Sequence, residues 1–226
     1  MPVIELLVVD DAIVVANKPS GLLVHRGWDD DDDVALFRVR DAVGAQVSPG
    51  HRRDRGTSGA LLFALSAAVT AALSRAFESG RVDKRYLALV RGTPPDAGLI
   101  DHPIPKKEAG ARVPARTRFR RVARSTVDRC SLVEARPETG RLHQIRRHLK
   151  HLHHPVVGDV NYGSGEINRH YRARYQLHRL ALHAHYLAFA HPLTEERIVV
   201  TAPVPDDLGA ALDALALPRS VDGAAE

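Results

Sequence analysis

The chain has almost no cysteine, since Cys130 is the only one among its 226 residues. A single cysteine excludes an intramolecular disulfide and a zinc site made of several cysteines, and it agrees with a reducing compartment. No apolar run approaches the roughly 20 residues of a membrane-spanning helix, and no basic leader precedes the first apolar run. We therefore expect a cytoplasmic protein that does not bind membranes, with Cys130 as a buried thiol.

Two common catalytic patterns are also missing. Thirteen histidines are present, but no H-E-x-x-H pattern or carboxylate set accompanies the run His148, His151, His153 and His154. No Ser/His/Asp motif is recognisable either. These gaps argue against a metal-dependent or acyl-enzyme hydrolase. The histidines are better interpreted as polar residues of a helix face, near the phosphates of a bound partner.

Positive charge is concentrated in one region. The net charge is +5, but residues 105–150 contain 14 Lys and Arg against 4 Asp and Glu. Within this region Arg116, Arg118 and Arg120 alternate with other residues, which predicts a strand with a basic stripe on one face. The stripe does not follow one face of a helix, so nucleic acid is a better partner than an anionic membrane. A solvated face that binds nothing is the alternative.

Apolar patterns predict short strands and a few amphipathic helices without a βαβ rhythm, which is typical of an α+β fold with a largely antiparallel sheet. Strands are expected at 3–9, 12–16, 61–65, 84–90, 117–123, 131–135 and 196–201, and helices between Ser66 and Gly80, over 141–152 and over 205–217.

One loop carries a carboxylate among arginines. Asp54 lies between Arg52, Arg53 and Arg55, and Thr57-Ser58-Gly59 follows. Nearby positive charges favour the ionised form of a carboxylate, so Asp54 suits a nucleophile or an ion-pair partner better than a proton donor. A loop Asp that only solvates a basic surface is the alternative.

This loop is one of five motifs that occur in a fixed order. They are Asn17-Lys18-Pro19-Ser20-Gly21, His51 to Gly59, Lys84-Arg85-Tyr86, Thr139 to Leu149, and the downstream pair His154 to Asp159 and Leu182-His183-Ala184. Together they resemble the RluA-type family of RNA pseudouridine synthases, and they cover most of the chain. Arg53 departs from the family pattern, which usually has Leu there.

The resemblance implies a fold and an activity. The expected fold is a single catalytic domain over residues 1–217, with a mixed, mainly antiparallel central sheet, an RNA-binding cleft and no N-terminal RNA-binding module; residues 218–226 are expected to form a disordered tail. The implied reaction breaks the N-glycosidic bond of a uridine, rotates the uracil and rejoins it through C5. It requires no oxidation, energy source or metal, so we expect no cofactor.

The resemblance also implies catalytic roles. Asp54 is the expected nucleophile, attacking ribose C1′ or uracil C6, and Tyr86 is expected against the flipped uracil, where it assists removal of the C5 proton. Arg146 is expected to pair with Asp54. A helix over 141–152 would independently place Arg146 on an apolar stripe with Leu142 and Leu149, where it must snorkel outward or meet a buried carboxylate. For Tyr86 the alternative is a core tyrosine.

A uridine that flips out of an RNA helix leaves a gap in the base stack. Arg52 matches the family position whose side chain fills this gap; the alternative is that Arg52 makes an ordinary phosphate contact. Further RNA contacts are expected from His51, Arg55, Arg141, His143 and Arg147.

The most specific of these expectations concerns the substrate. Leu23 to Arg26, Arg146 to Leu149 and Ile167 to Arg169 resemble a branch of the family that modifies a uridine in the T-stem of tRNA. Ribosomal RNA is the alternative substrate, and a non-catalytic RNA-binding module is the alternative class of protein. We expect the protein to act as a monomer.

Overall fold

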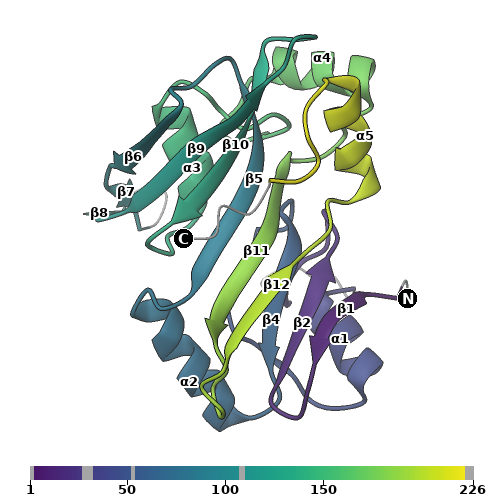
Figure 1. The fold of residues 1–226 in the computed structure, drawn as a ribbon, viewed down its shortest axis with the longest axis vertical. Helices are drawn as coiled ribbons and strands as arrows, with labels where there is room; N and C mark the ends of the chain where they lie inside the picture. Colours follow the sequence, from purple (N-terminus) through teal and green to yellow (C-terminus); the bar gives the residue numbers. More distant parts are fainter. Residues whose placement is uncertain (1–2, 27–32, 52–53, 107–109, 222–226) are drawn as a thin grey trace. The chain divides into compact units, whose positions relative to one another are not determined.

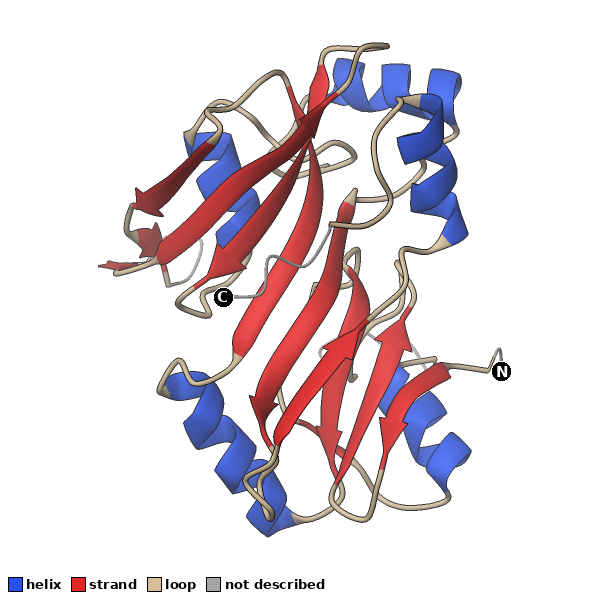
Figure 2. Ribbon diagram, in the orientation of Figure 1, coloured by secondary structure: helices blue, strands red, loops and turns tan. Residues whose placement is uncertain are grey.

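The computed structural model describes residues 3–26, 33–51, 54–106 and 110–221. Over these residues the chain is α+β, as predicted from the sequence, and Figure 2 shows strands flanked by separate helices. The chain divides into two compact units. Unit 1 contains residues 1–84 and 184–203, and unit 2 contains residues 85–183 and 204–226. Strands β5 (Asp83–Arg91) and β11 (Leu182–Ala190) contribute residues to both units.

Unit 1 is a set of strands with two helices. Strand β2 pairs antiparallel with β1 and with β4, β3 pairs with β4, and β11 pairs with β12. Helix α2 begins after Ser66, as predicted, and the Ser66 hydroxyl caps it by accepting a hydrogen bond from the Val69 N–H at 3.3 Å. The elements are β1 (Glu5–Val9), β2 (Ile13–Lys18), α1 (Ala35–Val43), β3 (Ser48–Pro49), β4 (Ser58–Ala64), α2 (Ala67–Glu78) and β12 (Arg197–Thr201).

Unit 2 is built on the antiparallel order β5-β10-β9-β6. Helix α3 packs against β9 and β10, and α4 packs against α5 (Figure 1). The elements are β6 (Ala97–Asp101), β7 (Ile104–Pro105), β8 (Arg112–Val113), β9 (Arg116–Arg124), β10 (Cys130–Pro137), α3 (Gln144–His151), α4 (Gly165–Tyr175) and α5 (Asp206–Ala214). Cys130 is a buried free thiol, as predicted.

The core strands of unit 1 are buried on both faces. Ile13 and Val15 of β2 belong to one apolar cluster, while Val14 and Ala16 of the same strand belong to another. Because successive side chains of a strand point to opposite faces, a strand covered on both sides needs an unbroken apolar run. This explains why β2 shows no polar alternation in the sequence.

The helix predicted over 141–152 is shorter than expected. Residue His143 has a left-handed conformation (φ 53°), and α3 begins only at Gln144. The Gln144 side chain accepts hydrogen bonds from the Arg141 N–H at 3.0 Å and from the Thr139 hydroxyl at 2.7 Å, so it organises the turn before the helix. Leu142, which was predicted on the apolar stripe, is consequently 48% exposed.

No helix in the described part of the chain is long and apolar enough to cross a membrane. The expected tail at 218–226 lies partly outside the described residues. Within the described part, the Arg219 guanidinium binds the Asp213 carboxylate, with Nε 2.9 Å from Oδ1.

Candidate active site

Asp54 lies in the loop between β3 and β4, where it is half-buried. Its carbonyl accepts a hydrogen bond from the Thr57 N–H at 3.1 Å, which closes a turn directly before β4. Thr57 and Ser58 are buried. The loop therefore joins a rigid, buried strand within four residues of Asp54.

A buried lysine holds the other side of this loop. Lys18 is 0% exposed, and its ammonium donates to the carbonyls of Pro19 at 2.8 Å, Leu22 at 2.7 Å and Arg55 at 3.1 Å. Three acceptors match the three N–H donors of an ammonium, which explains how this charge can be buried. Two of these carbonyls belong to the turn after Lys18, and the third directly follows Asp54.

The turn after Lys18 adds further contacts to the same segment. The Ser20 hydroxyl donates to the Gly56 carbonyl at 2.7 Å, and the Gly21 N–H donates to the Arg55 carbonyl at 2.9 Å. In return, Arg55 Nε donates to the Gly21 carbonyl at 2.9 Å. The Asn17 to Gly21 motif therefore fixes the backbone that immediately follows Asp54, a function that was not assigned from the sequence.

Glycine is required at the end of the Thr-Ser-Gly motif. Gly59 has φ 105°, and a Cβ at this position would lie 2.3 Å from the Ala184 carbonyl oxygen. A side chain would therefore push β4 away from β11.

Tyr86 lies on β5 of unit 2. It is paired with Ala135 of β10, which is in turn paired with Phe119 of β9, so the three side chains share one face of the sheet. Thr117, on the same face of β9, contacts Gln144 and His148 of α3. The structure thus brings Tyr86 and α3, the helix of Arg146, to the same face of this sheet.

Arg146 is buried and has a carboxylate partner in unit 2. Its Nε lies 2.7 Å from Oδ2 of Asp159, and its Nη2 lies 2.8 Å from Oδ1. The side chains are 8% and 0% exposed. The sequence indicated that Arg146 either snorkels outward or meets a buried carboxylate. In the structure its Nε and Nη2 bind a buried carboxylate, that of Asp159. The pairing of Arg146 with Asp54 stays a prediction.

The loop that carries Asp159 is fixed from three directions. Asp159 Oδ1 accepts the backbone N–H groups of Asn161 at 2.9 Å and Tyr162 at 3.0 Å. Asn168 of α4 accepts the Gly158 N–H and donates to the Asp159 carbonyl, both at 2.9 Å. Burial alone would raise the pKa of Asp159, but the hydrogen bonds and charge of Arg146, together with the backbone N–H groups of Tyr162 and Asn161, outweigh it and hold that pKa below its usual range.

Basic side chains of α3 contact Tyr162. The Arg146 guanidinium carbon lies 5.1 Å from the centre of the Tyr162 ring. Arg147 Nε donates to the Tyr162 hydroxyl at 2.7 Å, and that hydroxyl lies 3.0 Å from Nδ1 of His143. Asp159 binds the edge of the Arg146 guanidinium through hydrogen bonds, and the Tyr162 ring contacts the guanidinium as well. Together the two residues hold the guanidinium in a defined orientation. Both were missed from sequence, because their partners lie 13 or more residues away.

The remaining predicted RNA-binding residues are dispersed. Arg147 Nη1 donates to the Pro105 carbonyl at 2.9 Å, and exposed Arg141 donates through Nε to the Pro114 carbonyl at 3.2 Å. The His51 ring stacks at a tilt on Phe77, with centroids 4.6 Å apart. Arg52 and Arg53 lie outside the described residues, so the wedge role of Arg52 stays a prediction.

The predicted basic stripe on β9 is confirmed as a strand face, with Arg116, Arg118 and Arg120 outward and Thr117 and Phe119 buried. This face lies opposite that of Tyr86 and α3. Carboxylates of β10 and the following turn lie along it: Arg118 donates to Glu138 at 2.6 Å, and buried Glu134 lies 3.6 Å from Arg120 and 3.0 Å from Arg136. Part of the positive charge is therefore compensated within the sheet.

His148 was expected on a polar helix face near phosphates, and this expectation is wrong. The residue is 0% exposed. Its Nε2 donates to the His102 carbonyl at 3.0 Å, and its Nδ1 lies 2.9 Å from the Thr117 hydroxyl, which a neutral ring satisfies. Burial lowers the pKa of His148 below its ordinary value, against the opposing effect of the His102 carbonyl.

This lowered pKa predicts a loss of stability in mild acid. The neutral ring stabilises the folded state above the unfolded pKa of about 6.5, and this contribution is lost as pH falls from there toward the folded pKa. In urea unfolding, His148→Gln should cost about 1–3 kcal/mol at pH 7.5 and reduce the loss of stability between pH 7.5 and 5.5. His102, whose pKa is also lowered by burial, should retain part of that pH dependence. An unchanged pH dependence would contradict the buried neutral ring.

No group of three or more His, Cys, Asp or Glu in the described part of the chain is arranged to hold a metal ion.

Comparisons with known proteins agree with this fold and these motifs. The sequence pattern of the family described as RNA pseudouridylate synthase matches residues 12–151, more than half of the chain. The tRNA pseudouridine synthase C of Vibrio parahaemolyticus is 38% identical over 224 residues, covering 90% of this chain and 91% of that protein. The enzyme of the same name from Pasteurella multocida is 40% identical over 222 residues, covering 89% and 91%.

Solved structures give the same assignment. Human RNA Pseudouridylate Synthase Domain Containing 1 matches with a TM-score of 0.77 at 28% identity, covering 92% of this chain and 87% of the human one. Human RNA Pseudouridylate Synthase Domain Containing 4 matches with a TM-score of 0.76 at 27% identity, covering 95% and 94%. The chain therefore belongs to the RNA pseudouridylate synthase family, and it is an RNA pseudouridine synthase, an isomerase.

Proposed function

We propose that this enzyme converts one uridine in the T-stem of tRNA to pseudouridine. The observation that supports tRNA as the substrate is the similarity to proteins named tRNA pseudouridine synthase C, which extends over about nine-tenths of both chains. The T-stem position rests on the motifs Leu23 to Arg26, Arg146 to Leu149 and Ile167 to Arg169.

In the proposed mechanism the target nucleotide leaves the stem, and Arg52 enters the gap. The carboxylate of Asp54 attacks ribose C1′ or uracil C6, which allows the bond between C1′ and N1 to break. The uracil turns, a new bond forms between C1′ and C5, and Asp54 is released. N1 is protonated and C5 loses its proton, so the product is an isomer of the substrate.

Each side chain contributes through its chemistry. Tyr86 packs against the flipped uracil, and its hydroxyl assists removal of the proton from C5. Arg146 binds the Asp54 carboxylate and orients it for attack. The contacts of Arg146 with Asp159 and Tyr162 support this role, because they fix the guanidinium before substrate binds. The hydrogen bond from Lys18 to the Arg55 carbonyl, directly after Asp54, supports the role of that loop in the same way.

A substrate comparison tests this proposal. An unmodified tRNA transcript and a hairpin with the same T-stem sequence would be incubated with the enzyme in EDTA, and pseudouridine would be mapped at each position. We expect one modified uridine in the T-stem. We also expect the rate on folded tRNA to be at least about tenfold higher, because binding energy from remote contacts serves the reacting centre.

Equal rates on the two RNAs would contradict recognition of folded tRNA. Modification of ribosomal RNA alone would contradict the substrate, although not the reaction.

A further inference from the structure

The solvent-facing side of helix α4 is basic, with exposed arginines spread across its width. Arg169, Arg172 and Arg174 are exposed, while Tyr171 and Tyr175 point into the apolar core of unit 2. The helix therefore uses its two aromatic side chains for packing and leaves its arginines to solvent. No role in the reaction uses these arginines.

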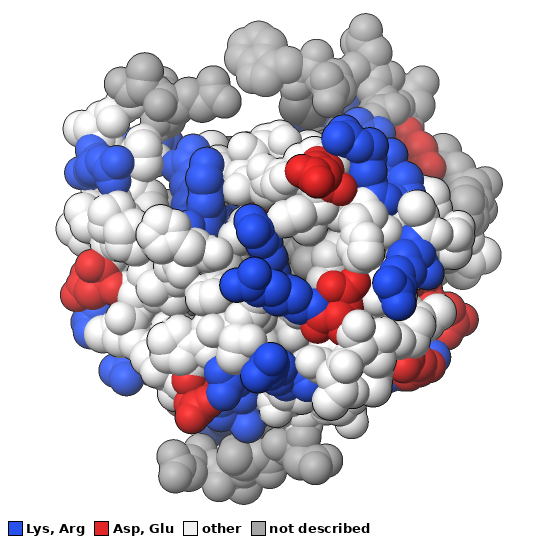
Figure 3. Space-filling view, turned by 90° about the horizontal axis from the view of Figure 1, so that it is seen from above, with Lys and Arg blue, Asp and Glu red and all other residues white. Residues whose placement is uncertain are grey.

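The turn between β9 and β10 extends this face. Asp128 in the turn lies 2.6 Å from Nε2 of His170 and accepts the Tyr175 hydroxyl at 2.9 Å, which joins the turn to α4. Exposed Arg124 and Arg129 flank Asp128. We call Arg124, Arg129, Arg169, Arg172 and Arg174 together the α4 surface. Figure 3 looks onto this end of unit 2, where Lys and Arg side chains lie across the middle of the face, with acidic side chains beside some of them.

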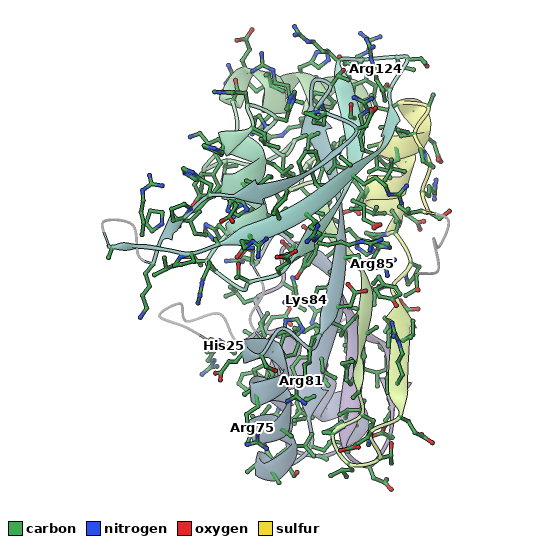
Figure 4. All side chains as sticks on the ribbon, turned by 60° about the vertical axis from the view of Figure 1, so that its left-hand side comes forward. His25, Arg75, Arg81, Lys84, Arg85 and Arg124 are labelled. Atoms are coloured by element: carbon green, nitrogen blue, oxygen red, sulfur yellow. The ribbon has the colours of Figure 1, made fainter. Side chains whose placement is uncertain are left out.

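The α4 surface lies at the end of unit 2 remote from Tyr86. At this end Arg91 of β5 is paired with Cys130, whereas Tyr86 is paired with Ala135, five residues further along β10. Five residues of a strand span about 17 Å. In Figure 4, Arg124 is labelled near the end of unit 2, far from Arg85, the neighbour of Tyr86.

Helix α4 is also hydrogen-bonded to the loop whose Asp159 pairs with Arg146. Asn168, on the first half of α4, holds the backbone of Gly158 and Asp159 by its two hydrogen bonds of 2.9 Å. The α4 surface and the Arg146 guanidinium therefore share one hydrogen-bonded scaffold. A docking face that is already ordered loses little conformational entropy when it binds.

We propose that the α4 surface binds backbone phosphates of the substrate RNA at a distance from the reacting uridine, in the part of a folded tRNA that a minimal stem lacks. Its positive charge suits a polyanion, and arginine can bind phosphate oxygens through two N–H groups. This inference rests on the proposed function, because it names how that substrate is held.

The test compares two triple variants. Arg169→Gln/Arg172→Gln/Arg174→Gln removes three charges from the α4 surface. The control, Arg40→Gln/Arg197→Gln/Arg219→Gln, removes three charges from α1, β12 and the segment after α5. Both variants would be checked for an unchanged melting temperature, and kcat/KM would be measured on tRNA and on the T-stem hairpin.

We expect the α4 variant to lose at least about tenfold in kcat/KM on tRNA, mainly through KM, and to stay near wild type on the hairpin. The slope of log binding constant against log salt on tRNA should become shallower by about 2–3, which corresponds to the lost phosphate contacts. The control should behave like wild type on both RNAs.

Two results would overturn the proposal: an unchanged kcat/KM on tRNA, or equal losses on tRNA and hairpin. Failure of the proposed function is distinguished by the wild-type enzyme itself, which would then modify neither RNA.

Discussion

Asp54→Asn is expected to reduce isomerisation by at least about three orders of magnitude while RNA affinity stays within a few-fold of wild type. The amide has nearly the shape of the carboxylate but cannot act as the nucleophile. Two contacts hold the loop through backbone carbonyls: Thr57 donates to the Asp54 carbonyl, and Lys18 donates to the Arg55 carbonyl. The loop should therefore keep its conformation. Single-turnover rates and filter binding on tRNA would measure both quantities.

Asp41→Asn is a suitable control, because Asp41 is an exposed carboxylate of the same unit and pairs with Arg40 on the surface. It should leave turnover and affinity unchanged. Turnover of Asp54→Asn near the wild-type rate would reject Asp54 as the nucleophile, and a large loss of RNA affinity would show that Asp54 mainly supports binding.

Arg146→Ala and Asp159→Ala are each expected to lower the free energy of unfolding by about 3–5 kcal/mol, since each breaks a buried ion pair by removing one partner. The double variant should cost clearly less than the sum of the two, because both single variants break the same buried pair. Urea unfolding of the wild type, the two single variants and the double variant at pH 7.5 would complete the double-mutant cycle. Arg219→Ala, which breaks the exposed pair with Asp213, should melt close to wild type.

The same variants separate stability from catalysis. If Asp159 positions Arg146, then Asp159→Asn, assayed well below its melting temperature, should lower kcat more than it raises KM. Additive losses of stability would contradict the buried pair. Wild-type kcat in Asp159→Asn would show that the orientation of Arg146 does not depend on Asp159.

Several features of the molecule could be predicted from short stretches of sequence. The alternation of residues 84–90 predicted strand β5, and its pairing with β10 confirms this strand. Ser66 and the apolar positions that follow predicted α2. The ordered motifs predicted the family, which the comparisons confirm. These predictions succeed because period, caps and motifs depend on residues close together in the chain.

Helix α4 was not predicted, and its composition explains why. Of its eleven residues only Tyr171 and Tyr175 are buried, so the sequence Gly165–Tyr175 has no apolar stripe of the usual width. Its position is set by tertiary contacts, including those of Asn168 with the Gly158–Asp159 backbone and of His170 with Asp128.

The sequence by itself determined the strand periodicity, the α+β class, the family and the residues that the motifs single out. Tertiary structure decided which of these residues meet. It made Asp159 the partner of Arg146, buried His148, placed the arginines of β9 on the face opposite Tyr86, and directed Lys18 to the carbonyl after Asp54. The reason is physical: hydrogen bonds and ion pairs in a folded protein join groups 13 to 46 residues apart, as for Arg146 with Asp159 and His148 with His102. Local sequence shows that a buried charge needs a partner, but only the packed chain selects which one.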